Sequence, residues 1–187
     1  MGADLERLFV DASACTACRL CRARTNVVFG SGAVDARLFV VGEAPGREED
    51  LFGTPFVGRS GRLLDQLLHD ELGLSRAECY VANVVKCRPP ANRDPLPDEV
   101  RSCRHFLDAQ LAAVSPSAIL TLGNFATRTM LDTTEGITRL HGRVFAVSSA
   151  ALVATFHPAA ALRGGGAVLD QMRADFRVLA DVLRPGR

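Results

Sequence analysis

Short apolar runs that alternate with amphipathic segments are the feature of this sequence that most constrains its fold. The four clearest runs have the length and apolar content of buried strands. They span residues 37–41, 79–85, 118–122 and 152–156. Between them, apolar residues recur every three or four positions, as on one face of a helix. Strands that alternate with helices predict a parallel sheet covered on both faces. We therefore expect a three-layer α/β/α fold around a central, mostly parallel four-stranded sheet.

Two further elements are expected towards the C-terminus. Apolar residues between 169 and 183 recur at helical spacing, and they predict a helix that packs into the core. Residues 136–147 are predicted to add a hairpin, with His141 and Gly142 as its turn.

Length and composition favour one folded domain over residues 1–187. Hydrophobic residues make up 48% of the chain and charged residues 23%, which is typical of a globular protein. The apolar runs are far shorter than the roughly 20 residues of a membrane span. Asp4 and Glu6 stand where a secretory signal would carry basic and then apolar residues. We expect a cytoplasmic monomer with no membrane partner.

Two arginine-rich stretches are candidates for contact with phosphate groups. Residues 12–34 hold three arginines and no acid, and residues 86–93 hold three cations and no acid. The alternative is that both are solvated loops, since almost all cations in this chain are arginine and the net charge is only +1. Charge alone favours the alternative.

Polar side chains follow three of the predicted strands directly. Glu43, Asn83 and His157 lie at or just after the ends of their strands. Ligands of parallel sheets bind in the crevice beyond the carboxyl ends of the strands. The sequence therefore predicts that a carboxylate, an amide and an imidazole converge on one rim.

The cysteines indicate a metal site. Cys15 and Cys18 have the spacing that lets one turn offer two sulfurs to one metal, in a polar segment without buried periodicity. Cys87 follows a strand, and Cys103 lies on an apolar helix face where a buried free thiol is the simpler interpretation. Cys21 extends the N-terminal pattern, so spacing does not say which two sulfurs bind. Zinc and an iron-sulfur cluster both remain open.

A series of motifs gives a more specific interpretation. They are Gly42–Gly46, Gly53–Gly58 with Gly61, Asn83–Pro90 with Asn92 and Arg93, and His157–Pro158 with Leu162 and Arg163. In order and spacing, the series resembles the family 4, or iron-sulfur, uracil-DNA glycosylases. The resemblance runs from Cys15 to Arg163, which is most of the chain.

The resemblance implies a cofactor and an activity. A 4Fe-4S cluster would be held by Cys15, Cys18, Cys87 and Cys103, in an N-terminal iron-sulfur-binding segment of the single domain. The partner would be uracil-containing DNA. The enzyme would flip uracil out of the stack and hydrolyse its N-glycosidic bond, leaving an abasic site for base-excision repair.

The resemblance also assigns roles around the base. Phe56 would stack on uracil, and the amide of Asn83 would donate to O4 and accept from N3–H. His157 would donate to O2, where negative charge develops, assisted by backbone amides of the loop that contains Gly42 and Ala44. Glu43 would position or activate water and support the sugar cation.

Three further positions follow from the resemblance. Glu49 would lie against C5 of the base and exclude thymine by its bulk. Leu162 and Arg163 would enter the minor groove and fill the space left by the flipped base. Ala159 departs from the serine that family members often carry after His-Pro, so a phosphate-facing hydroxyl is not expected there.

Two alternatives compete with this interpretation. A related class binds uracil-DNA covalently through a histidine in an inserted loop, but residues 88–95 contain no histidine. From a different class, the chain would be a non-catalytic iron-sulfur or zinc module that binds nucleic acid, or a redox sensor that uses Cys21. A module that only binds has no use for Glu43, Asn83 and His157 together.

Overall fold

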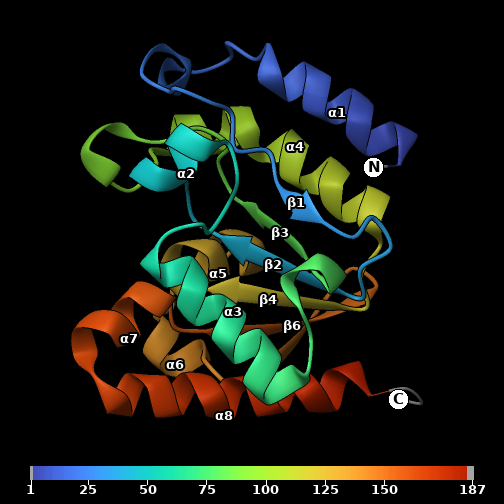
Figure 1. Ribbon diagram of the computed structural model, residues 1–187, viewed down its shortest axis with the longest axis vertical. Coiled ribbons are helices and arrows are strands. Elements are labelled where there is room, and N and C mark those ends of the chain that lie inside the picture. The colour runs from blue at the N-terminus through green and yellow to red at the C-terminus, as the bar shows by residue number, and fades with distance from the viewer. Residues whose placement is uncertain (1, 185–187) are drawn as a thin grey trace.

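In the computed structural model, residues 2–184 are described, and they contain a six-stranded sheet with the order β1-β3-β2-β4-β6-β5 (Figure 1). The strands are β1 (Ser31–Gly32), β2 (Leu38–Gly42), β3 (Tyr80–Asn83), β4 (Ala118–Leu122), β5 (Val144–Val147) and β6 (Ala150–Thr155). The inner four, β3, β2, β4 and β6, are mutually parallel. Each outer strand pairs antiparallel with its neighbour.

The central strands are buried on both faces, which explains their nearly continuous apolar sequence. Every residue of β2 and of β4 is buried. Leu38 and Val40 of β2 join one hydrophobic cluster, whereas Phe39 and Val41 join the other. Because successive strand residues point to opposite faces, each face of the sheet receives its own apolar layer.

Helices form the two outer layers. The α-helices are α1 (Ala3–Ser13), α2 (Arg47–Phe52), α3 (Arg59–Leu72), α4 (Pro97–Val114), α5 (Gly123–Leu131), α6 (Ile137–Leu140), α7 (Pro158–Gly164) and α8 (Gly166–Leu183). Short 3-10 helices are η1 (Arg19–Arg22), η2 (Arg76–Glu78) and η3 (Pro90–Asn92). Apolar residues of α3, α7 and α8 cover one face of the sheet, and those of α1, α4, α5 and α6 cover the other.

The predicted fold class is confirmed, and the four predicted strands are the four parallel ones. One edge strand, β1, was not predicted, and the other, β5, lies within the segment predicted as a hairpin, so the sheet has six strands instead of four. The first is only two residues long, and β5 alternates between exposed and half-buried positions without a buried residue. β1 therefore offers no apolar run, whereas β5 is apolar in sequence but lies at the exposed edge of the sheet.

The predicted hairpin over residues 136–147, with His141 and Gly142 as its turn, is wrong, because residues 137–140 are helical and the hairpin of the structure joins β5 to β6. The segment around residue 140 forms α6 because Ile137 and Leu140 are buried on one side of it. His141 lies with Nδ1 3.0 Å from Oδ1 of the buried Asp175. The turn instead joins Val147 to Ala150, which pair across β5 and β6, and Ser148 adopts a left-handed φ of 51° there.

The sheet brings the candidate site residues to one edge. Because β2, β3, β4 and β6 are parallel, their carboxyl ends meet on the same side. Both α2 and α7, which follow β2 and β6, lie on that side in Figure 1. Among residues 2–184, no helix has the length and apolar character needed to cross a membrane.

Candidate active site

Gly42, Asn83 and Phe56 form the floor of the candidate site. Gly42 ends β2 and is paired in register with Asn83, the last residue of β3. A Cβ atom at Gly42 would overlap Oδ1 of Asn83 and lie 2.6 Å from the ring of Phe56. Glycine is therefore required here because an amide and an aromatic ring both pack against its backbone.

The side chain of Asn83 offers a buried acceptor. The residue is only 2% exposed, and its Oδ1 has no hydrogen-bond partner within the described part of the chain. A buried, unpaired polar atom costs free energy unless a ligand or water completes it. Such an oxygen is suited to accept a hydrogen bond from an N–H group of a bound molecule.

The backbone of Asn83 is fixed by Lys86. The buried Lys86 Nζ donates to the carbonyl oxygen of Asn83 at 2.7 Å and to Oε1 of Gln110 at 2.6 Å. Burial lowers the pKa of Lys86 to about 8. Lys86 belongs to a stretch that was a candidate for phosphate contact, but its ammonium group lies in the interior.

His157 is held as a neutral donor. It caps the N-terminus of α7, and its Nδ1 accepts from the backbone N–H of Ala159 at 3.1 Å. Burial, aided by Arg163, lowers the pKa of His157 to about 4, so the imidazole is neutral at pH 7. Since Nδ1 accepts, the ring proton is assigned to Nε2. The ring centroid lies 6.0 Å from that of Phe56.

Glu43 begins the loop after β2. Its carbonyl oxygen accepts from the N–H of Val85 at 3.2 Å, which fixes the loop backbone beside β3. Burial, with a smaller contribution from Asp94, raises the pKa of the Glu43 carboxyl to about 7. A carboxyl group that titrates near neutrality is suited to act as a general base.

Glu49 has a structural task that sequence analysis did not foresee. Its Oε1 accepts from the N–H groups of Val57 and Gly58, at 3.0 and 3.1 Å, and its Oε2 accepts from that of Gly46 at 3.1 Å. The carboxylate thus ties the start of α2 to the loop that carries Phe56. Its predicted contact with the C5 position of a base stays a prediction.

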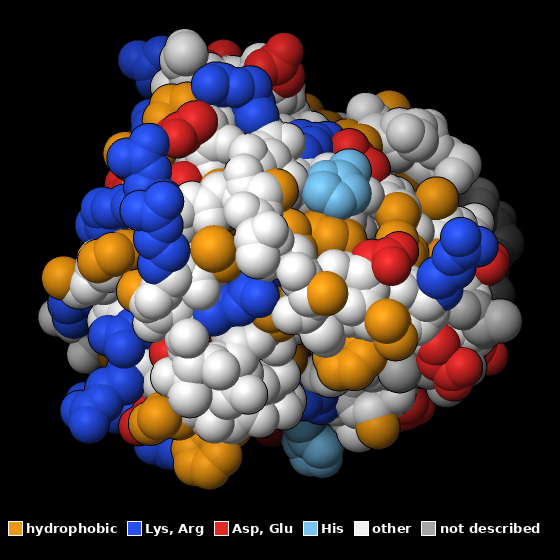
Figure 2. All heavy atoms as spheres, turned by 90° about the horizontal axis from the view of Figure 1, so that it is seen from above, with side chains coloured by type: hydrophobic (Ala, Val, Ile, Leu, Met, Phe, Trp, Pro, Cys, Tyr) orange, Lys and Arg blue, Asp and Glu red, His pale blue; other side chains and the backbone are white. Residues whose placement is uncertain are grey.

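Leu162 and Arg163 lie on α7, beyond His157. Both are exposed, Leu162 to 41%. Viewed from above, arginine side chains gather along the left edge of the molecule (Figure 2), on the side where α2 and α7 lie in Figure 1. The predicted minor-groove segment is therefore accessible beside the candidate site.

The four predicted ligand cysteines line one cavity. Its volume is about 20 Å³, and Cys21 lines it as well. The lining cysteines are Cys15, Cys18, Cys21, Cys87 and Cys103. The sixth, Cys79, is buried in the core on the other face of the sheet. Among residues 2–184, no three His, Cys, Asp or Glu side chains converge as they would around a single metal ion.

Two cations adjoin the cysteines. Both Arg24 and Lys86 line the cavity. Arg24 Nη1 donates to Sγ of Cys87 at 3.2 Å and to the carbonyl oxygen of Cys15 at 2.8 Å. Arg24 favours the thiolate form of Cys87, but burial outweighs it and raises the pKa of the Cys87 thiol, and burial raises the pKa of Cys103 to about 11.

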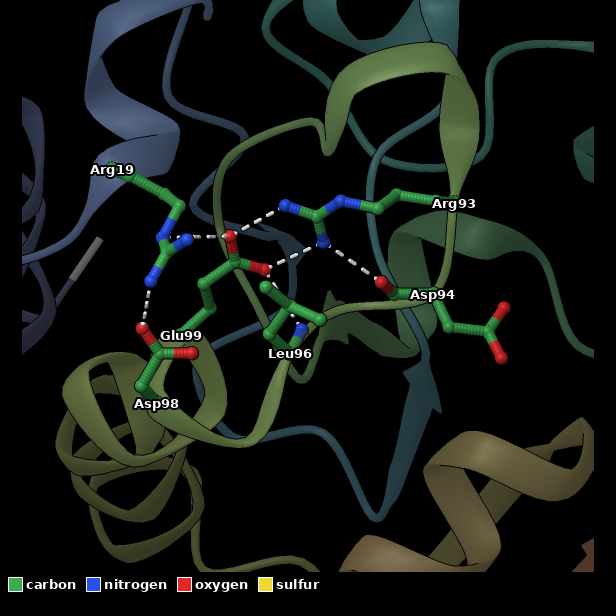
Figure 3. Close-up of polar contacts among 6 residues, drawn as sticks. All are labelled: Arg19, Arg93, Asp94, Leu96, Asp98 and Glu99. Atoms are coloured by element: carbon green, nitrogen blue, oxygen red, sulfur yellow. Dashed lines mark hydrogen bonds and ion pairs between the residues drawn. The ribbon is translucent and has the colours of Figure 1, made fainter.

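A charged network joins the cysteine segment to the loop before α4 (Figure 3). Arg93 donates to both oxygens of Glu99, at 2.8 and 2.6 Å. Arg19 donates to Asp98 at 2.7 Å and lies 3.8 Å from Glu99. Within the predicted arginine strips, these two cations are therefore neutralised by acids of α4. Arg19 and Arg93 are thus ion-paired within the protein, which neither the phosphate-facing interpretation nor the solvated-loop alternative foresaw.

Comparison with known proteins identifies the family. Residues 29–180 match the model of the Uracil DNA glycosylase superfamily. The chain belongs to this superfamily. It is 47% identical over 151 residues to a type-4 uracil-DNA glycosylase of Thermotoga maritima, covering 80% of this chain and 78% of that one.

Two archaeal relatives extend the match. A type-4 uracil-DNA glycosylase of Sulfurisphaera tokodaii is 41% identical over 85% of this chain and 76% of its own length. One from Saccharolobus solfataricus is 36% identical over 96% of this chain and 87% of its own. The resemblance to type 4 of the superfamily is thereby confirmed.

The raised pKa of Glu43 predicts a pH-dependent stability. Between pH 4.5 and about 7 the unfolded carboxyl ionises while the folded one keeps its proton, so wild-type stability falls as pH rises through this window. Glu43→Gln lacks this loss. The melting temperature of Glu43→Gln minus that of wild type should therefore increase between pH 4.5 and pH 8. Because the site is partly exposed, we expect a gain of roughly 1 kcal/mol in the free energy of unfolding, which corresponds to a few degrees.

The matched control is Glu78→Gln. Hydrogen bonds from Ser75 lower the pKa of Glu78, so from about one pH unit above its ordinary value of 4.5 it is ionised in both states over the rest of the window. In thermal denaturation, the melting temperatures of Glu78→Gln and of wild type should differ by a constant amount over that range. A constant difference for Glu43→Gln as well would contradict the raised pKa.

Proposed function

We propose that this chain is a uracil-DNA glycosylase that binds uracil-containing DNA, flips the uracil out and hydrolyses its N-glycosidic bond to leave an abasic site. The observation that carries the proposal is the buried, unpaired Oδ1 of Asn83, set against Gly42 and the ring of Phe56. The type-4 relatives carry the name of this activity. Release of free uracil from a uracil-containing oligonucleotide, without added magnesium, is the direct test.

Asn83 would recognise the base, and Phe56 would hold it. The Asn83 amide accepts from N3–H of uracil through Oδ1 and donates to O4 through its nitrogen. Cytosine has an acceptor at N3 and a donor at position 4, so it cannot form this pair of hydrogen bonds. A base that lacks the N–H would leave the buried oxygen unpaired, at a cost of about 1–3 kcal/mol. The ring of Phe56 offers the stacking surface. Backbone N–H groups of the loop with Gly42 and Ala44 would assist at O2.

His157 and Glu43 would act on the breaking bond. As the bond to the sugar lengthens, negative charge gathers on uracil O2 and positive charge on the sugar. A neutral imidazole with its proton on Nε2 donates to the developing anion without titrating. Once ionised, Glu43 would orient or deprotonate the attacking water and stabilise the sugar cation. Glu49 would limit space at C5.

The first prediction from this mechanism separates catalysis from recognition. His157→Ala should slow single-turnover excision by roughly a hundredfold or more, with little change in binding to uracil-DNA. Asn83→Asp should lose uracil excision, because a carboxylate cannot donate to O4, and weak cytosine excision is expected where the acid is protonated.

The control for the histidine is His69→Ala, on the exposed surface of α3. It should excise uracil at the wild-type rate. Full single-turnover activity of His157→Ala, or normal uracil excision by Asn83→Asp, would show that these roles are assigned to the wrong residues.

A 4Fe-4S cluster is proposed for the cysteine cavity, with Cys15, Cys18, Cys87 and Cys103 as ligands. The residues fit the group: the cavity is lined by thiols, and Arg24 and Lys86 supply the charge that balances thiolates. When bound, the cluster would clamp the N-terminal segment to the β3–α4 loop. Free cysteines suit a reducing compartment, so we place the enzyme in the cytoplasm, and we propose that it acts as a monomer.

The cluster leads to the second prediction. Protein purified anaerobically should be brown and contain about four irons per chain. Cys15→Ala and Cys87→Ala should lose the colour and melt at a lower temperature. Cys79→Ala is the matched control, since its thiol is buried in the opposite core, and it should keep both colour and iron. Zinc without iron in the wild-type protein would exclude the cluster.

The third prediction concerns the exposed Leu162. Leu162→Ala should weaken excision from duplex DNA more than from a single strand, because only the duplex has to be unstacked. Val144→Ala removes an equally exposed apolar side chain on β5 and should affect neither substrate. Equal losses on the two substrates would mean that Leu162 does not act as a wedge.

A further inference from the structure

Phe56 adopts a backbone conformation that phenylalanine rarely takes. Its φ is 54°, in the left-handed region, although its ring is buried at the candidate site. Such a conformation persists only where surrounding contacts impose it. The contacts of the neighbouring peptide groups therefore show what sets the position of the ring.

Arg76 holds the carbonyl groups on one side. Its Nη1 donates to the carbonyl oxygen of Pro55 at 2.8 Å, and its Nη2 donates to that of Phe56 at 2.9 Å. Nη2 also reaches the carbonyl oxygen of Gly61 at 3.4 Å. Asp65 accepts from Nε at 2.7 Å and so orients the guanidinium group. One planar, largely buried side chain thus binds two successive carbonyl groups.

The opposite side of the same turn is held by Glu49. Its Oε1 accepts from the N–H groups of the two residues that follow Phe56. Gly61 lets the turn approach α3 closely, since a Cβ there would overlap the carbonyl oxygen of Phe56. The peptide groups before and after Phe56 are therefore both anchored by ionic side chains.

We infer that Arg76 is a positioning residue for base recognition, which fixes the ring of Phe56 at the height and tilt needed to stack on a flipped uracil. The inference rests on the proposed stacking role of Phe56. Arg76 itself does not touch the ring or the reacting atoms. It acts through two backbone oxygens, and loss of the guanidinium group lets the turn relax from its left-handed conformation.

A double-mutant cycle tests the inference. Single-turnover excision is measured for Arg76→Gln, Phe56→Ala and the double variant, with thermal denaturation of each. Arg76→Gln should slow excision roughly tenfold or more, because small misplacements of a binding group have large effects on rate. When Phe56→Ala is already present, Arg76→Gln should lower the excision rate by no more than about twofold. Inhibition by free uracil should weaken in parallel.

The matched control is Arg177→Gln, which removes another arginine that is ion-paired between two elements, here with Glu71 of α3. It should leave excision unchanged. If Arg76→Gln folds poorly, Asp65→Asn loosens the guanidinium group without removing it. That variant should give a smaller loss, which also vanishes in the Phe56→Ala background.

The outcomes separate the two proposals. Full excision by Phe56→Ala would overturn the stacking role itself. If Phe56→Ala is slow but Arg76→Gln is as fast as the control, Arg76 does not position the ring. Equal loss from Arg76→Gln in both backgrounds would likewise assign Arg76 to the fold alone and overturn the inference.

Discussion

The packing of two side chains against Gly42 is the constraint on which the rest of the site depends. Because this residue ends a central strand without a Cβ, the Asn83 amide and the Phe56 ring can both lie over it. Their packing excludes water from the Asn83 oxygen and leaves it unpaired within residues 2–184. A ligand that directs an N–H group at this oxygen offsets the cost of its desolvation.

Asn83 also joins two regions of the molecule that perform different tasks. Its side chain lies at the candidate active site, whereas its carbonyl oxygen accepts from Lys86, which lines the cysteine cavity. A buried ammonium group is costly unless its hydrogen bonds are satisfied, and Asn83 and Gln110 supply two acceptors. The end of β3 is thereby positioned from the cavity side as well as from β2. Phe56 is anchored in a comparable way, since its left-handed backbone costs roughly 1–2 kcal/mol that Arg76 and Glu49 must offset.

The sequence predicted what depends on local pattern and missed what depends on distant partners. The inner strands were recognisable because burial on both faces demands apolar residues throughout. β5 is apolar as well, but its partner strand follows it in the sequence and was not recognised as the other arm of the hairpin. The turn at Ser148 was missed since neither of its serines is a strong turn signal. Glu43, Asn83 and His157 were found because parallel strands deliver their ends to one edge. Arg76, by contrast, is one arginine among many, and nothing near it in sequence marks its bonds to the Phe56 turn. Arg93 was grouped with phosphate-facing cations because its partner, Glu99, lies just beyond the acid-free stretch.

The burial of Lys86 has a consequence for the chemistry of the whole surface. It is the single lysine of the sequence, and it is only 1% exposed. The folded chain therefore presents no lysine amine to acylating reagents, and its positive surface consists of guanidinium groups, which such reagents do not modify at neutral pH. Acylation of Lys86 requires its buried amine to leave the carbonyl oxygen of Asn83 and the side chain of Gln110 on α4. The rate of that reaction would report how often this part of the core opens, with no engineered label.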